Sequence, residues 1–472
     1  MYSPTCYTTS TADPICLQGT TAVPFVPVAG IIIGMSVFGL LSDALGRRWG
    51  SRLTVSFMLL GSIILTVANG TNLAGQFIMF NIGMFLFALG VGGEYPMAAS
   101  SASERSETEK LPRGRTVAFT FANQGWGNMI NTAITLFFLQ VTGVGGCVSA
   151  DAPGGKNVNK LDPATGNTST FQNEYCNEYQ MEVAWRLSFA LGIPFVAGLW
   201  AYRWFILTES KMWVDRQQAK YSAEERAIIR ARRIANTKLL FGRKYLPRLI
   251  GAAGGWFLWD VAFYGNKLFQ GTIISAILGS APQTLLINFE YTLLNSFIAL
   301  IGYYFAAFTI DKKWMGRVRM QIMGFAVCAA FFLACGFNYS YLTEPANLGG
   351  FQVMYFLTSF FGQFGPNVTT WLLPVELFPT DVRAQAHGFS AASGKVGALL
   401  ATLIFSYGNN GGKPGADWIF EVSGYFVLAG FVVTVLFVPD ITNVPLAEID
   451  RRWSMDRRAA QGETTSAVAV KE

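Results

Sequence analysis

The chain has 472 residues, of which 51% are hydrophobic and only 14% are charged. Phe and Gly are abundant, at 39 and 49 residues, and Gly is common where membrane helices pack closely. The net charge of +6 is spread over separate loops, which argues against a nucleic-acid partner. The sequence holds no zinc-ligand spacing, no P-loop and no nucleophile elbow, so nothing in it supports an enzyme, a metal site or a cofactor.

Eleven apolar stretches are each long enough to cross a bilayer, which takes about 20 residues. They are residues 23–41, 53–69, 76–99, 116–141, 185–207, 249–277, 286–309, 320–337, 349–372, 388–406 and 419–438. The fold class predicted from these spans is an all-α polytopic membrane protein.

Basic residues crowd every second loop, and the positive-inside rule makes those loops cytoplasmic. The predicted organisation begins with an extracytoplasmic segment, 1–22, and a first helical bundle of five spans, 23–207. A basic cytoplasmic linker, 208–248, a second bundle of six spans, 249–438, and a cytoplasmic tail, 439–472, follow.

Two residues of opposite charge lie deep inside predicted spans, Asp260 in the span 249–277 and Lys395 in the span 388–406. A charge at the bilayer centre costs roughly 3 kcal/mol or more, so such residues usually face a partner or a water-filled path. Trp256, Asp260 and Tyr264 recur every four residues and therefore share one face of a helix. We expect Asp260 and Lys395 to face one cavity, and we take Lys395 as the only cation within a span.

The two halves of the chain carry related loops. The first inside loop, 39–50, contains Asp43, Gly46 and Arg47, and the second half has Asp311, Gly316 and Arg317 at the matching place. Related halves joined by a charged middle segment are typical of secondary transporters.

Residues 39–50 resemble the loop signature of the major facilitator superfamily, whose members have two helical bundles and twelve spans. Further segments resemble its phosphate:H⁺ symporter family of fungi and plants: 92–96, 256–264, 364–370, 374–383 and 387–397. In that superfamily the signature loop joins spans two and three. We therefore expect eleven of the usual twelve spans, with the first transmembrane span missing.

The resemblance, together with the intramembrane positions, identifies candidate site residues. The candidates for substrate binding are Tyr95, Gln124, Trp256, Asp260, Tyr264, Asn367 and Lys395, and those for proton coupling are Glu94 and Asp260. Glu94 stands where the family usually has Asp. Each candidate has a plainer alternative: Asp260 and Lys395 as a structural pair, the aromatic residues as packing, and Asn367 as a bond between helices.

Six charged residues at the predicted cytoplasmic ends of spans resemble the charge network that closes such transporters toward the cytoplasm. They are Asp43, Arg47, Arg48, Glu104, Glu376 and Arg383. The alternative is that they only set topology and stabilise helix ends.

The function expected from these observations is proton-coupled uptake of inorganic phosphate by alternating access, in the plasma membrane, with the C-terminus in the cytoplasm. The expected partners are phosphate or a related anion, protons and the lipid bilayer. Two alternatives stay open: transport of a larger phosphorylated or organic anion, such as a glycerophosphodiester, and phosphate sensing by a receptor that does not transport.

Overall fold

A computed structural model describes residues 14–70, 73–146, 158–161, 168–171, 178–208, 231, 234–279, 284–379, 381–407, 415–442 and 444–460. Within these ranges only the backbone is described for residues 14–24, 39–47, 73, 100, 103–105, 107–108, 158–161, 168–171, 178 and 406–407.

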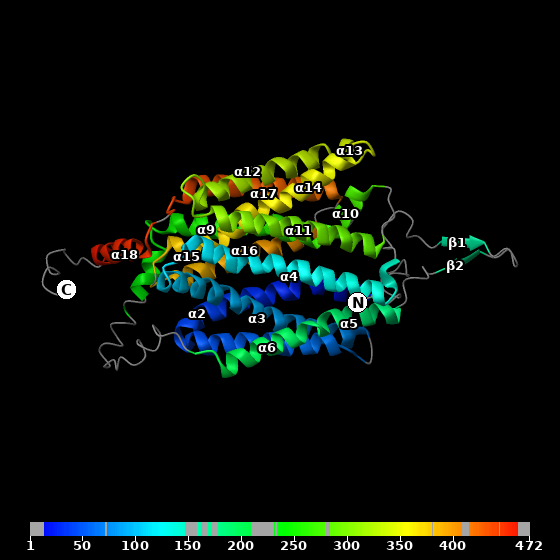
Figure 1. The fold of residues 1–472 in the computed structure, drawn as a ribbon, viewed down its shortest axis with the longest axis horizontal. Helices are drawn as coiled ribbons and strands as arrows, with labels where there is room; N and C mark the ends of the chain where they lie inside the picture. The colour runs from blue at the N-terminus through cyan, green and yellow to red at the C-terminus, as the bar shows by residue number, and fades with distance from the viewer. Residues whose placement is uncertain are drawn as a thin grey trace.

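Long helices run side by side along the length of the molecule (Figure 1). The first half contains α2 (Pro14–Val67), α3 (Leu73–Thr108), α4 (Arg113–Val141), a 3₁₀ turn η1 (Val144–Gly146), α5 (Glu178–Ala190) and α6 (Gly192–Phe205). The second half contains α9 (Leu246–Leu268), α10 (Gln270–Leu278), α11 (Leu285–Thr309), α12 (Gly316–Phe337), α13 (Tyr339–Leu342), α14 (Leu348–Gly362), the π-helical turn η2 (Gln363–Asn367), α15 (Val368–Leu377), α16 (Arg383–Tyr407), α17 (Ala416–Phe437) and α18 (Leu446–Ala460).

The predicted all-α polytopic membrane fold is confirmed. Seven helical stretches in the described part of the chain have the length and apolar composition to cross a membrane. They are Arg48–Val67, Ala74–Ala99, Tyr179–Phe205, Leu285–Thr309, Gly316–Phe337, Arg383–Phe405 and Ala416–Phe437, and Phe25–Phe38 is a shorter apolar stretch. A small antiparallel hairpin of β1 (Val158–Leu161) and β2 (Thr168–Phe171) was not predicted, and it lies beyond one end of the helices (Figure 1).

The chain reverses direction within α2, although the backbone stays helical through the predicted loop 39–50. The ring centroids of Phe38 and Phe57 are 6.4 Å apart. In a straight helix these residues would be separated by about 28 Å, at 1.5 Å per residue. The two arms of α2 therefore lie antiparallel, and both pack on α3 through glycines. A Cβ at Gly34 would overlap the carbonyl oxygen of Leu89.

The two halves meet along two helix pairs, α4 with α11 and α2 with α16. A hydrophobic cluster fills the space between the halves, with Phe121 of α4 stacked on Trp371 of α15 at 4.7 Å. Polar side chains buried in this region must therefore find partners within the protein.

A methyl group at Gly34 should weaken the packing of α2 on α3. We expect Gly34→Ala to destabilise the protein by about 1–3 kcal/mol, because the added atom overpacks a closed contact. The measurement is the thermal unfolding midpoint of purified protein in detergent. Gly198→Ala is the matched control, since Gly198 is also within a helix but a Cβ added there would have no neighbouring atom within 4 Å. Equal midpoints for the two variants would contradict the close packing of α2 on α3.

Candidate functional site

The structure brings Asp260 of α9 and Lys395 of α16 together. The ammonium Nζ of Lys395 lies 2.8 Å from Oδ2 of Asp260 and donates a second hydrogen bond to the hydroxyl of Tyr264 at 2.9 Å. Asp260 is 1% exposed and Lys395 is 3% exposed. A buried carboxylate and ammonium are thus neutralised as a pair, which removes most of the cost of burying either one alone.

Small residues on α16 allow α9 to come this close. A Cβ at Gly394 would lie 2.5 Å from Cδ1 of Trp256, and one at Gly397 would overlap the carbonyl oxygen of Phe257. Trp256 packs over Gly394, and its ring centroid is 5.6 Å from that of the buried His387. The glycines on both sides of Lys395 therefore place its side chain directly against the Trp256–Asp260–Tyr264 stripe.

Tyr95 of α3 and Gln124 of α4 extend this cluster into the first half of the chain. The ammonium of Lys395 lies 5.5 Å from the ring centroid of Tyr95, within cation–π range. Nε2 of Gln124 donates to the hydroxyl of Tyr95 at 3.3 Å. The site is consequently built from both halves of the chain.

A network of neutral side chains continues from Gln124 into the second half. The hydroxyl of Tyr303 on α11 donates to Oε1 of Gln124 at 2.6 Å and accepts from Nδ2 of Asn367 at 2.8 Å. The amide of Asn367 also donates to Oε1 of Gln363 at 2.5 Å, and its Oδ1 accepts from the indole of Trp259 at 3.0 Å. Asn367 was predicted; Tyr303, Gln363 and Trp259 were not.

A backbone irregularity positions Gln363 and Asn367. The turn η2 is π-helical, and Gly365 within it has non-helical dihedrals of φ −133° and ψ −112°, just before Pro366. π-helical turns inside membrane helices occur often at functional sites because they reorient side chains. The sequence signal that could have found the site was the Gly-Pro pair inside a predicted span.

Glu94 lies apart from the Asp260–Lys395 pair. Both carboxylate oxygens of Glu94 accept from Arg203 of α6, at 2.5 and 2.7 Å, and Thr54 of α2 donates to one of them. Arg203 also donates to the carbonyl oxygen of Ser51 at 3.0 Å. This carboxylate joins α2, α3 and α6, and Arg203 as its partner was not predicted.

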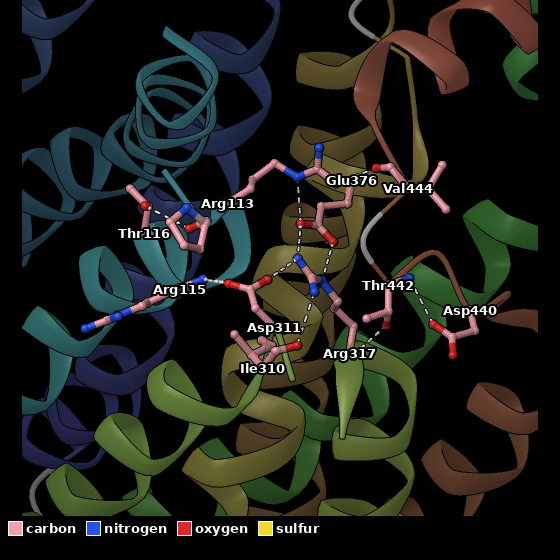
Figure 2. A network of polar contacts seen from close by, with 11 residues as sticks. Arg113, Arg115, Thr116, Ile310, Asp311, Arg317, Glu376, Asp440, Thr442 and Val444 are labelled. Atoms are coloured by element: carbon pink, nitrogen blue, oxygen red, sulfur yellow. Dashed lines mark hydrogen bonds and ion pairs between the residues drawn. The ribbon is translucent and has the colours of Figure 1, made fainter. Parts of the chain in front are cut away.

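A charge network joins the two halves at the α18 end of the molecule (Figure 2). Glu376 of α15 accepts from Arg113 of α4 at 2.8 Å and from Arg317 of α12 at 2.8 and 3.0 Å. Arg317 also pairs with Asp311 at 2.7 Å, and Asp311 accepts from the backbone N–H of Arg115 at 2.7 Å. We call these four side chains, Arg113, Asp311, Arg317 and Glu376, the latch network.

Only Glu376 among the predicted gating residues has a described role in the latch network. Arg383 is buried at the start of α16, and Arg48 is half-buried in α2. The side chains of Asp43, Arg47 and Glu104 lie outside the described part of the chain. The other three members of the latch network were not predicted as gating residues. Arg113 was counted among the basic loop residues, and Asp311 and Arg317 belonged to the repeated loop motif.

A cavity of about 270 Å³ lies between α4, α9, α11 and α14. Trp259, Tyr303 and Gln363 form part of its wall and also belong to the neutral network described above. Lys267 lines it as well, inside the predicted span 249–277, so the expectation that Lys395 is the only cation within a span is wrong.

Comparison with known proteins relates the chain to transporters. The profile of the sugar (and other) transporter family matches residues 6–150 and 260–453. The chain is 32% identical to probable inorganic phosphate transporter 1-6 of Arabidopsis thaliana, over 82% of this chain and 76% of that protein. It is also 32% identical to inorganic phosphate transporter 1-2 of Oryza sativa subsp. japonica, over 94% of this chain and 86% of that protein.

Solved structures of the proton:xylose symporter XylE have the same fold. The form bound to 6-bromo-6-deoxy-D-glucose has a TM-score of 0.66 at 17% identity and covers 93% of this chain and 89% of that chain. The inward open form from E. coli has a TM-score of 0.57 at 19% identity, with the same coverage. The chain is thus an integral membrane protein of a transporter family and not an enzyme. It belongs to the sugar (and other) transporter family, in the branch that contains the plant inorganic phosphate transporters.

Proposed function

We propose that the protein carries inorganic phosphate into the cell together with protons, by alternating access, in the plasma membrane and with its C-terminus in the cytoplasm. The relatives named as inorganic phosphate transporters support the choice of anion. The observation that carries the proposal is the enclosed contact of Lys395 with Asp260 and Tyr264 between two helices.

Lys395 is the group that binds the anion in this mechanism. Its ammonium offers three N–H donors, and a tetrahedral oxyanion can accept them when Lys395 turns from Asp260. The hydroxyl groups of Tyr264 and Tyr95 and the amide of Gln124 lie around the same ammonium and are suited to bind the remaining oxygens. A site with these polar groups suits an oxyanion.

Asp260 is the group that couples the anion to a proton. The Lys395–Asp260 pair is neutral when it is empty, and a bound monoanion would leave the enclosed site with a net charge of about −1. A proton on Asp260 restores neutrality and frees Lys395 to face the anion. The loaded site that crosses the membrane is therefore one that holds both the anion and the proton.

Glu94 was the second candidate for proton coupling, and its geometry supports a different role. Both oxygens of the Glu94 carboxylate are held by one guanidinium, and one of them also accepts from a hydroxyl, so this side chain connects three helices. We propose that Glu94 fixes the packing of α3 against α6, and that Asp260 is the main proton carrier.

The latch network supports alternating access. Its ion pairs connect α4 of the first half with α12 and α15 of the second, so a path opening at this end must break the Arg113–Glu376 contact. In the described structure these ion pairs are formed. We propose that the latch network holds the protein closed toward the cytoplasm until the loaded site releases it.

Removing the cation should remove anion binding. We expect Lys395→Ala to weaken phosphate binding by roughly 100-fold or more, because charge-assisted hydrogen bonds contribute about 1.5–3 kcal/mol each. Asp260→Asn should keep part of the binding, lose its dependence on pH and fail to accumulate phosphate, since the amide cannot carry a proton across. The measurements are radiolabelled phosphate binding to purified protein between about pH 5 and 8, and uptake into vesicles with and without a proton gradient.

Lys312→Ala is the control for that experiment, because Lys312 is an exposed lysine near the latch network and belongs to neither site. The double variant Asp260→Asn/Lys395→Ala removes both charges together, so no unpaired charge is left buried. Normal phosphate binding by either Lys395→Ala protein would show that the anion site lies elsewhere. Binding without any uptake by the unmodified protein would instead favour a receptor.

Removing the carboxylate of the latch network should destabilise the closed protein. Burial raises the pKa of Glu376, but the charges and hydrogen bonds of Arg317 and Arg113 outweigh it, so its pKa lies below the usual value. A lowered pKa stabilises the fold above about pH 4.3, and this contribution is lost as pH falls through the lowered value. We expect Glu376→Gln to cost about 3 kcal/mol at neutral pH, with the difference from the unmodified protein narrowing in acid.

The test is the unfolding midpoint of both proteins in detergent as the pH is lowered. Glu448→Gln is the matched control, because Glu448 also pairs with two arginines but lies on the exposed face of α18. Its midpoint at neutral pH should match that of the unmodified protein. A difference between Glu376→Gln and the unmodified protein that stays constant down to acid pH would contradict the ionised latch network.

A further inference from the structure

The cavity between α4, α9, α11 and α14 has an unbalanced charge. Lys267 is the one charged side chain among the residues that line it, all of which belong to the described part of the chain. The rest of the lining is largely neutral and polar, with asparagines from three of the helices, including Asn131, Asn266 and Asn295. A concave polar surface with a single positive charge favours an anion.

Lys267 differs from Lys395 in having no carboxylate beside it. Within the ranges that the structure describes, Lys267 has no ion pair, and its ammonium lies 5.5 Å from the ring centroid of Phe263. Its side chain lines the cavity and has solvent-accessible surface. An anion could therefore bind Lys267 without first displacing a protein carboxylate.

The uncharged part of the lining offers hydrogen-bonding groups to such an anion. Asn131, Asn266 and Asn295 line the cavity, and an amide side chain carries both donors and an acceptor. Oδ1 of Asn266 and Oδ1 of Asn295 are buried and accept no hydrogen bond from any described residue. The cavity therefore suits a polar anion, and the positive charge of Lys267 is the feature that selects it.

The position of Lys267 connects this cavity to the inner site. Lys267 follows Asp260 by seven residues, which places it on nearly the same face of α9 and about 10 Å farther along the axis. The cavity lies toward the C-terminal part of α4, away from the latch network at the N-terminal end of that helix. Between the cavity and the inner site lie Trp259, Tyr303 and Gln363.

We propose that Lys267 and the polar cavity around it form a capture site for a small oxyanion, which binds there before it reaches Lys395. The identity of the anion as phosphate rests on the proposed function; the existence of an anion site at Lys267 does not. The capture site attracts the anion by the charge of Lys267, and the polar lining of the cavity offers it hydrogen-bonding groups.

Uptake kinetics test the role of the charge. In vesicles, Lys267→Gln should raise the KM for phosphate roughly tenfold and leave the maximal rate within about twofold, because a single charge in a cleft changes local anion concentration by about that factor. Lys267→Arg keeps the charge and should retain a KM near the original value. Lys312→Gln removes a charge at the opposite end and should change nothing. An unchanged KM in Lys267→Gln, or equal losses in the Gln and Arg variants, would overturn the proposal.

A second measurement does not depend on phosphate transport. A cysteine introduced by Gln270→Cys lies on the cavity wall and can be labelled with anionic and cationic thiol reagents, with labelling of the parent protein subtracted. The anionic reagent should react faster, phosphate should slow it, and Lys267→Gln should reduce the preference roughly tenfold. No preference for the anionic reagent would refute the capture site. A clear preference in a protein that takes up no phosphate would refute the proposed function and leave the anion site standing.

Discussion

The ion pair between Lys395 and Asp260 is the constraint on which the arrangement of the site depends. Neither charge can be buried alone without a large cost in free energy, so α9 and α16 must stay in close contact as long as the site is empty. Gly394 and Gly397 make that contact possible, and the hydroxyl of Tyr264 accepts a second hydrogen bond from the ammonium. The empty site is therefore a neutral, buried pair.

The sequence alone was sufficient for the parts of the site that carry charge in an apolar span. Charged residues are rare inside membrane spans, so Asp260 and Lys395 could be identified as candidates from the sequence. The four-residue spacing of Trp256, Asp260 and Tyr264 showed that they share one face of a helix. The roles of Tyr303, Gln363 and Trp259 could not be predicted, since hydroxyl, amide and indole groups occur in many spans. Only the tertiary contacts distinguish a network from single hydrogen bonds between helices.

The all-α fold was predictable from the sequence, because the length of an apolar stretch is a local property. The reversal within α2 was expected from the spans on either side, but the helical backbone across it was not.

Ion pairs at the ends of the spans were harder to predict, because the positive-inside rule already explains why basic residues occur there. Arg113 and Arg317 counted as basic loop residues, and nothing local shows that both reach Glu376. Glu94 presents the opposite case: its place in a glycine-rich span suggested a titrating acid, but its partner Arg203 comes from α6, which follows more than a hundred residues later. In both cases the function of a charge depends on long-range packing, and the sequence shows only that the charge is present.

Lys267 and Lys395 differ in how their charge is balanced, and under the proposed mechanism this difference gives the pathway a direction. At Lys267 the positive charge has no described carboxylate partner, so an anion can bind there without proton transfer. At Lys395 the charge is already neutralised, so an anion that arrives there must compete with Asp260. Adding a proton to Asp260 ends that competition. Under the proposed mechanism, an anion attracted by Lys267 gains a stable place at Lys395 only when a proton arrives as well, and the order of the two charges along α9 and α16 then links uptake to the proton.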